Sequence, residues 1–325
     1  MINSKPKVVW RTWLSFVLMW ALFMPILAQA YTGITILLSA PTQTNLEFVQ
    51  DFKEELITTK NHNLKVKVID LTEVDKLVVA ENSELVVALG VKALEAASKL
   101  RKSTPVIGVF TPLPTFNALL ENSKRDLGNF SAVVLDQPYA RQIALIKIIL
   151  PGAKSCGILL GLTSTQYAEH LKEEGEKNAL NVNLELIKDD TELIPKLQKV
   201  LEGNDALLAV PDPLIYNRET AQPILLTSYR HQKPIFGYSQ SYVRAGALAA
   251  VFSNTKQLAK QTAEIAIKTQ QAPGLLPPPQ APKYFSVQVN RQVARSLSIN
   301  IIEDEEIYKK VLQLESVQRT EVDNK

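Results

Sequence analysis

The sequence has little of the chemistry that metal sites and disulfides require. It contains one cysteine, Cys156, and three histidines in 325 residues. A single cysteine excludes an internal disulfide and a structural zinc site made of cysteines. His62, His170 and His231 stand apart in polar or charged surroundings, so we expect them at the surface and expect no metal site. Cys156 lies in an apolar segment, which predicts a buried and unreactive thiol.

An excess of charge of one sign is also missing. Lys and Arg total 36 and Asp and Glu total 33, but Lys5, Lys7 and Arg11 are the only charged residues of segment 1–30. Residues 31–325 therefore carry 33 charges of each sign. A neutral chain without a basic block lacks the electrostatic footprint of a nucleic-acid-binding protein. We therefore expect no nucleic-acid partner.

Long apolar runs are confined to the N-terminus. Residues 13–27 form an apolar run that follows the three basic residues and precedes Ala28-Gln29-Ala30, which is the layout of a signal peptide with its cleavage site. An uncleaved membrane anchor is the alternative, but the run is short for a span of about 20 residues. We predict cleavage after Ala30 and a periplasmic location. All three tryptophans would leave with the leader, which disfavours a carbohydrate ligand stacked on indole.

Catalytic and cofactor-binding motifs are absent as well. The sequence has no G-x-G-x-x-G and no H-E-x-x-H, and Gly152–Gly157 resembles a phosphate loop but is followed by Ile158 where a lysine is required. Gly237–Ser241 falls one residue short of a nucleophile elbow, so an exported hydrolase with Ser239 as nucleophile is a minor alternative. We predict that the protein is not an enzyme and needs no cofactor.

Short β-branched runs alternate with longer amphipathic segments along residues 31–325. This alternation is typical of α/β proteins with parallel sheets. The pattern restarts after Pro151-Gly152, which indicates two doubly wound three-layer (αβα) lobes of about 100 residues each. The expected strands are 34–38, 65–70, 85–89, 106–110, 131–135, 156–160, 182–187, 206–210, 234–237, 247–252 and 284–290.

Ligands of such sheets bind outside the carboxyl ends of the strands. We therefore expect recognition in the segments after Leu38, Leu89, Phe110, Leu160 and Val210. Asp212 follows an expected strand directly, between Pro211 and Pro213. It is either a turn residue at a helix entry or a carboxylate that faces a ligand.

Three stretches carry a resemblance to a known family. They are Asp205–Asp212, Lys233–Phe236 with Ser241–Leu248, and Phe285–Asn290 with Ala294 and Leu297. On these stretches the chain resembles the periplasmic substrate-binding proteins of ABC importers, of the tryptophan/tyrosine type, which adopt the type 1 periplasmic-binding-protein fold.

The resemblance implies two lobes joined by three crossover segments, near Leu135, Arg244 and Pro282. The N-terminal lobe would hold residues 31–134 and 245–281, and the C-terminal lobe residues 135–244 and 282–325. Such a protein closes by hinge motion around a small molecule, which it delivers to an ABC transporter permease. We expect a monomer. The alternative is an exported sensing module that reports to a membrane receptor or kinase.

The resemblance and the strand-end rule together suggest the ligand contacts. Helix N–H groups near Thr42–Thr44 suit a carboxylate and Asp212 suits an ammonium, which favours an amino-acid-like ligand. For each hydroxyl residue, helix capping is the alternative. The expected ligand-binding residues are Ser39, Thr42, Gly90, Thr111, Thr163, Asp212 and Tyr242.

Overall fold

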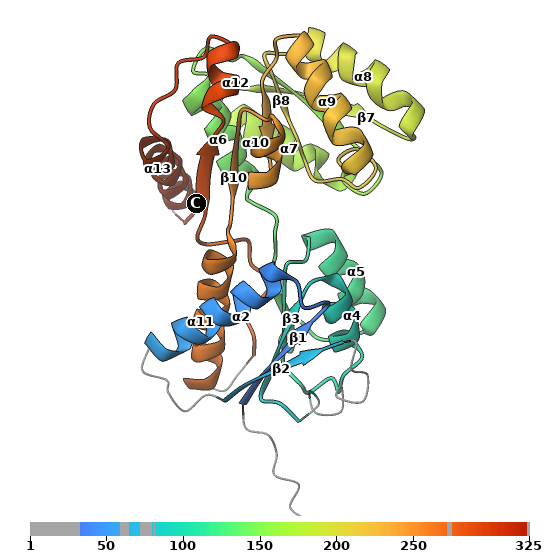
Figure 1. Cartoon of the computed structure of the whole chain (residues 1–325), viewed down its shortest axis with the longest axis vertical. Helices are drawn as coiled ribbons and strands as arrows, with labels where there is room; N and C mark the ends of the chain where they lie inside the picture. The colour runs from blue at the N-terminus through green and yellow to red at the C-terminus, as the bar shows by residue number, and fades with distance from the viewer. Residues whose placement is uncertain (1–32, 59–64, 72–79, 81, 272–274, 324–325) are drawn as a thin grey trace, which may run out of the picture.

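The structure, a computed structural model, describes residues 33–58, 65–71, 80, 82–271 and 275–323. Two lobes follow one another along the long axis of the molecule, and each is built on one sheet (Figure 1). The predicted signal peptide and His62 lie outside the described residues. Within the described part of the chain, no helix has both the length and the apolarity that a membrane crossing needs.

The first lobe contains a five-stranded parallel sheet in the order β2-β1-β3-β4-β5. Its strands are β1 (Gly33–Leu38), β2 (Lys65–Asp70), β3 (Leu85–Leu89), β4 (Val106–Val109) and β5 (Phe130–Val133). Its helices are α2 (Gln43–Thr58), α4 (Val91–Ser98), α5 (Leu113–Ser123) and α11 (Thr255–Gln271). Successive side chains of a strand point to opposite faces, so Ile36 packs with α2 and α11, and Leu37 packs with α4. Helices therefore cover both faces of the sheet.

The second lobe contains a six-stranded sheet in the order β11-β10-β9-β8-β6-β7. Its strands are β6 (Ser155–Leu160), β7 (Asn181–Leu186), β8 (Ala206–Leu208), β9 (Ile235–Gly237), β10 (Ala249–Phe252) and β11 (Ser286–Val289). Its helices are α6 (Tyr139–Ile149), the 3-10 helix η2 (Thr165–Tyr167), α7 (Ala168–Lys177), α8 (Asp190–Glu202), α9 (Arg218–Arg230), α10 (Gln240–Ala245), α12 (Arg291–Ser296) and α13 (Asp304–Asp323). All strand pairs are parallel except β10 with β11. The predicted fold class, two αβα lobes, is confirmed.

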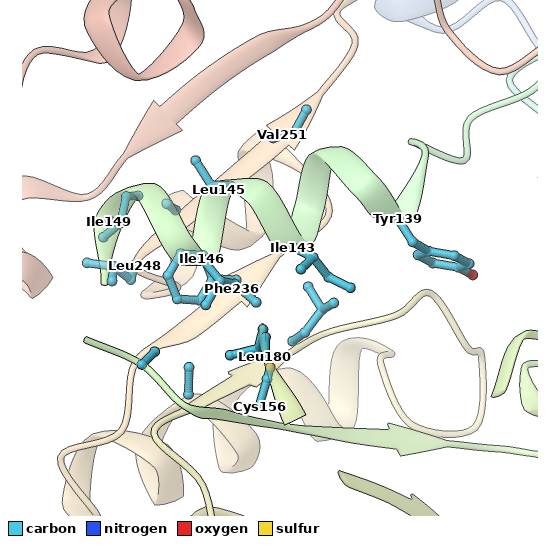
Figure 2. Packing of buried hydrophobic residues seen from close by; sticks show 14 of the residues in the cluster. Tyr139, Ile143, Leu145, Ile146, Ile149, Cys156, Leu180, Phe236, Leu248 and Val251 are labelled. Atoms are coloured by element: carbon cyan, nitrogen blue, oxygen red, sulfur yellow. The ribbon is translucent and has the colours of Figure 1, made fainter. Parts of the chain in front are cut away.

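The core of the second lobe shows how one apolar helix face is used. Ile143 and Ile146 of α6 point toward Phe236 of β9 and Cys156 of β6 (Figure 2). Cys156 is buried, as predicted, and burial raises the pKa of its thiol to about 12. The thiolate, which is the nucleophilic form, is therefore suppressed. Cys156 acts as a small apolar residue of the core.

Three segments cross between the lobes. The first, around residues 134–138, joins β5 to α6; the second joins β10 to α11; the third, around residues 280–284, joins a bridge between Gln280 and Val133 to β11. The second crossing lies at Ser253 and Asn254 rather than near Arg244 as predicted. β10 pairs with β9 and β11 in the second sheet, so the boundary predicted at residue 245 is corrected to residue 253.

A reciprocal cap ends the second crossing and begins α11. The Asn254 side chain accepts a hydrogen bond from the Gln257 N–H at 2.9 Å, and the Gln257 side chain accepts one from the Asn254 N–H at 3.0 Å. This pair satisfies two N–H groups that a helix start would otherwise leave free. The chain is therefore held at the position where it re-enters the first lobe.

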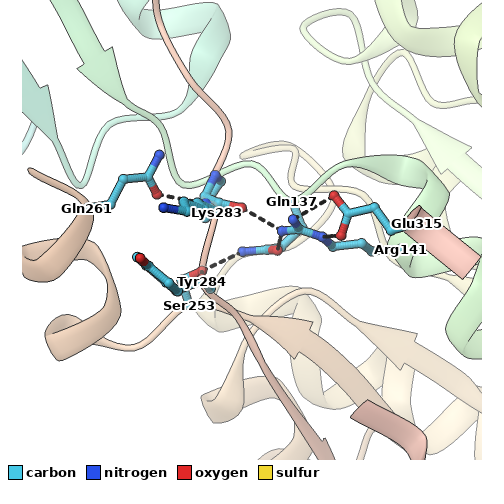
Figure 3. A network of polar contacts seen from close by, with 8 residues as sticks. Gln137, Arg141, Ser253, Gln261, Lys283, Tyr284 and Glu315 are labelled. Atoms are coloured by element: carbon cyan, nitrogen blue, oxygen red, sulfur yellow. Dashed lines mark hydrogen bonds and ion pairs between the residues drawn. The ribbon is translucent and has the colours of Figure 1, made fainter. Parts of the chain in front are cut away.

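A polar network ties all three crossings together (Figure 3). Gln137 of the first crossing donates from Nε2 to the Ser253 hydroxyl of the second at 2.8 Å. Ser253 in turn donates to the Tyr284 carbonyl of the third at 2.5 Å. The first of these contacts joins residues 116 positions apart in the sequence, and the second joins residues 31 apart.

Arg141 of α6 is the centre of this network. Its side chain is only 2% exposed, and it makes a two-pronged ion pair with Glu315 of α13, with both N–O distances at 2.8 Å. Its Nη1 also donates to Gln137 Oε1 at 3.0 Å and to the Pro282 carbonyl at 2.6 Å. The guanidinium lies over the Phe285 ring, 4.3 Å from its centroid. One buried cation thus joins α6, α13 and two crossings.

Removing the acidic partner tests how much this network holds. We expect Glu315→Ala to lower the free energy of unfolding by about 3–5 kcal/mol, because a buried guanidinium loses its counter-charge. The matched control is Glu305→Ala on the same helix, whose ion pair with Lys309 is 72% and 70% exposed. That variant should lose under about 1 kcal/mol. Urea denaturation of both variants measures the difference, and equal losses would contradict the role given to Arg141.

Candidate ligand-binding site

A cavity of about 540 Å³ lies between the lobes, a size suited to a small molecule. Segments that follow strands of both sheets line it, together with the first and second crossings and the first turns of α2 and α11. The strand-end rule therefore located the cleft correctly, because the carboxyl ends of the parallel strands in the two lobes meet at it.

Asp136, in the first crossing, is the carboxylate that lines this cleft. Its Oδ2 accepts a hydrogen bond from the Leu113 N–H at the start of α5, at 2.6 Å. Burial raises the pKa of Asp136, and the hydrogen bond to Leu113 offsets this rise in part. Within the described residues no cation forms an ion pair with it. Asp136 is therefore a carboxylate whose desolvation the protein compensates only in part.

Arg244, on α10 of the second lobe, is the cation that lines the same cleft. Its side chain is exposed and has no ion-pair partner among the residues that the structure describes. A guanidinium presents several N–H donors in a plane and binds carboxylates with two parallel hydrogen bonds. The cleft thus contains one carboxylate, Asp136, and one guanidinium, Arg244, that form no ion pair with the described residues.

Aromatic rings form much of the remaining wall. Phe110, Tyr139, Tyr238 and Phe252 all line the cleft. Tyr139 meets Tyr167 edge to face, with ring centroids 5.6 Å apart, and burial and the neighbouring Tyr167 and Asp136 raise its pKa. Tyr139 therefore stays a neutral phenol at physiological pH.

The backbone at Phe110 is strained. Its φ is 56°, in the left-handed region that bulky residues rarely occupy. The ring packs edge to face on Phe48 of α2, with centroids 5.5 Å apart. This conformation places an aromatic residue directly at the end of β4, where the cleft begins.

None of the seven residues expected to contact the ligand is among those that line this cleft. Four of them, Ser39, Thr42, Gly90 and Thr111, lie in the first lobe. The Ser39 hydroxyl donates to the Leu89 carbonyl and accepts from the Ala93 N–H, and the Thr42 hydroxyl accepts from the Asn45 N–H of α2. Gly90 begins α4 with φ 88°, and Thr111 is fully buried. Capping, the alternative named for the hydroxyls, is what Ser39 and Thr42 do.

Asp212 and Thr163 are brought together in the second lobe. Asp212 is 3% exposed, and its carboxylate accepts from the hydroxyls of Thr163 and Ser164, at 2.6 and 2.8 Å, and from the Leu214 N–H at 2.9 Å. These bonds fasten the loop after β6 to the loop after β8. A ligand contact by Asp212 stays a prediction, and its oxygens already have three partners.

Tyr242 is buried behind the wall of the cleft. Its ring stacks on Tyr238 with centroids 5.5 Å apart, and it meets Tyr216 at right angles at 5.9 Å. Tyr238 is the member of this group that lines the cleft. Tyr242 thus supports a wall residue. The alternative nucleophile Ser239 lines the cleft too, and its hydroxyl caps α10 by accepting the Tyr242 N–H at 3.2 Å.

Sequence reasoning missed Asp136, Arg244 and the aromatic wall. A signal for Asp136 existed, since it is the acid next to the crossing expected near Leu135. For Arg244 the sequence indicated only a nearby crossing. Among the described residues, no three His, Cys, Asp or Glu side chains gather in a way that could hold a metal ion.

Comparison with known proteins agrees with this architecture. The family model described as ABC transporter substrate binding protein matches residues 45–313. A curated relative, the tyrosine-binding protein of Clostridioides difficile (strain R20291), is 23% identical over 194 residues; the match covers 58% of this chain and 55% of the relative, so it spans about half the length of each.

Solved structures share the fold. A Streptococcus pneumonia ABC domain in complex with L-Trp is 20% identical, with a TM-score of 0.56 over 86% of this chain and 98% of that one. A ligand-free, open substrate-binding protein with adhesive properties from Clostridium difficile is 18% identical, with a TM-score of 0.68 over 84% of this chain and 97% of that one. The fold is therefore that of type 1 periplasmic binding proteins.

The raised pKa of Asp136 predicts a pH signature in the protein without ligand. A carboxyl whose folded pKa lies above its unfolded value destabilises the fold as pH rises through that interval. Asp136→Asn should therefore gain stability relative to wild type between acidic and neutral pH. Melting temperatures of both proteins from pH 4 to pH 7.5 measure this.

Asp205→Asn serves as the opposite control. Hydrogen bonds from the Lys154 and Ser155 N–H groups and the Ser155 hydroxyl lower the pKa of Asp205. That carboxylate stabilises the fold above its unfolded pKa, so its variant should lose stability over the same pH range. A difference between Asp136→Asn and wild type that stays constant with pH would show that burial does not strain Asp136.

Proposed function

Since the chain belongs to the ABC transporter substrate-binding proteins, whose members bind a small molecule and serve a transporter, we propose that this protein captures an aromatic amino acid in the interlobe cleft. The observation that carries the proposal is the pair of unpaired charges, Asp136 and Arg244, on the wall of one cavity.

The two charges suit the two ends of an amino acid. Asp136 would bind the ammonium, and the ammonium would compensate the burial that raises the pKa of this carboxyl. Arg244 would bind the carboxylate. Because Asp136 is bonded to the Leu113 N–H of the first lobe and Arg244 belongs to α10 of the second, a zwitterion that bridges them would also link the two lobes.

The aromatic wall supports a ring on the ligand. Phe110, Tyr139, Tyr238 and Phe252 supply faces and edges for stacking, which contributes roughly 0.5–1.5 kcal/mol for each aromatic pair beyond the buried area. The relatives are consistent with this, since one is called a tyrosine-binding protein and another was solved with L-Trp.

Transport accounts for the remaining features. Proteins of this family are exported; for this chain we propose a periplasmic location after cleavage behind Ala30. The lobes would close about the three crossings, and the closed monomer would deliver its ligand to an ABC permease. No step of this cycle needs catalysis, a cofactor or nucleic acid.

Titration calorimetry of residues 31–325 with L-tyrosine and L-tryptophan tests the proposal. We expect saturable binding of at least one, and a rise of several degrees in melting temperature, because a ligand at 100 times Kd stabilises the fold by about 2.7 kcal/mol. Asp136→Asn should weaken binding by roughly 10- to 100-fold, the effect of losing a charged hydrogen-bond partner. Affinity should also fall as pH drops through the raised pKa of Asp136.

Two controls make the result specific. Asp126→Asn, an exposed carboxylate outside the cleft, should bind like wild type. The analogue of tyrosine without its amino group should not bind to wild type. Binding of neither amino acid, or equal affinity of wild type and Asp136→Asn, would refute the proposed site.

A further inference from the structure

One buried polar group in the cleft has no partner. Gln142, on α6, is 3% exposed and lines the cavity, yet its Oε1 accepts no hydrogen bond from the described protein. Buried amide oxygens are rarely left in this state, because an unsatisfied acceptor destabilises a protein by about 1–3 kcal/mol.

A second glutamine, in the crossing that leads into α6, shows the contrast. Gln137, one turn before Arg141, uses both ends of its amide: Nε2 donates to Ser253, and Oε1 accepts from Arg141. That amide belongs to the polar network that ties the three crossings together. Gln142 is as well buried and of the same chemistry, but its Oε1 accepts no hydrogen bond from the described residues. The fold therefore does not account for its polarity.

The position of Gln142 relates it to the other cleft groups. It follows Tyr139 by three residues, so the two lie on neighbouring faces one turn apart, about 4.5 Å along the helix axis. Asp136 precedes Tyr139 by three residues in the crossing. Along this segment the cleft thus presents a carboxylate, then an aromatic ring, then an amide oxygen.

This order matches the order of groups in one class of ligand. We propose that Gln142 Oε1 accepts a hydrogen bond from an N–H or O–H on the ring of the bound amino acid, and so selects tryptophan or tyrosine over phenylalanine. The inference rests on the proposed function and deepens it. The ammonium lies at Asp136, the ring beside Tyr139, and the ring donor at Gln142. A site built to hold a hydrogen-bonding group rejects the analogue without it, because its own polar group is then left unpaired.

Paired ligands isolate this contact. Calorimetry would compare L-tyrosine with L-phenylalanine, and L-tryptophan with 1-methyl-L-tryptophan, which lacks the indole N–H. Wild type should prefer the donor-bearing member of at least one pair by roughly 5- to 100-fold. Gln142→Met keeps the length of the side chain and removes the acceptor. It should reduce that preference to less than about threefold, mainly by weakening the donor-bearing ligand.

Two further measurements guard the interpretation. Gln198→Met, at an exposed glutamine of α8 that does not line the cleft, should keep the wild-type preference. Gln142→Met without ligand should melt at or above the wild-type temperature, since no structural hydrogen bond is lost. A clear fall in that temperature would give the amide a structural role and overturn the proposal.

The outcomes separate this inference from the proposed function. If wild type binds the amino acids without preference within either pair, or if Gln142→Met keeps the preference, the role of Gln142 is refuted and the amino-acid site stands. If wild type binds none of the four ligands, the proposed function fails, and the inference fails with it.

Discussion

The arrangement of the two lobes depends on the buried guanidinium of Arg141. A cation this far from water is tolerated only when charge and hydrogen bonds compensate its desolvation, and here Glu315, Gln137 and Pro282 do so together. The consequence is structural: these partners come from α13 and from two of the three crossings. The hydrogen bond from Gln137 to Ser253 includes the remaining crossing, the second. Hydrogen bonds and one ion pair thus join the three crossings to one another and to α6 and α13.

The charged residues that line the cleft lack the ionic partner that Arg141 has. Arg141 has Glu315 as its ionic partner, whereas Asp136 and Arg244, which line the cleft, form no ion pair within the described residues. A partly buried carboxylate without an ion-pair partner in a cleft is a candidate ligand-binding group. Gln137 and Gln142 show a similar contrast: the amide of Gln137 is engaged in the crossing network, whereas the amide oxygen of Gln142 accepts no hydrogen bond from the described residues.

The sequence predicted the architecture well, because strong local signals agree with it. Residues 65–70 alternate charged and apolar side chains and form the edge strand β2, and the continuous apolar runs form central strands. The second crossing was misplaced because β10 reads as an apolar strand that could belong to either sheet. Only its pairing with β9 and β11 decides, and pairing is tertiary. The position of the cleft followed from topology alone.

The individual site residues could not be predicted in this way. A hydroxyl after a strand can cap the next helix or face a ligand, and Ser39 and Thr42 use theirs for capping. Asp212 and Asp136 both follow strands, but two of the three partners of Asp212 come from a loop about fifty residues away in the sequence. Burial and existing hydrogen bonds, which a single sequence does not reveal, distinguish the two carboxylates.

A crystal structure of the protein bound to L-tyrosine or L-tryptophan tests the central claim most directly. The account predicts closed lobes, with the amino nitrogen at hydrogen-bond distance from Asp136 and the carboxylate against Arg244. A ligand held instead by Asp212 and Thr163, or one outside the interlobe cavity, would contradict it.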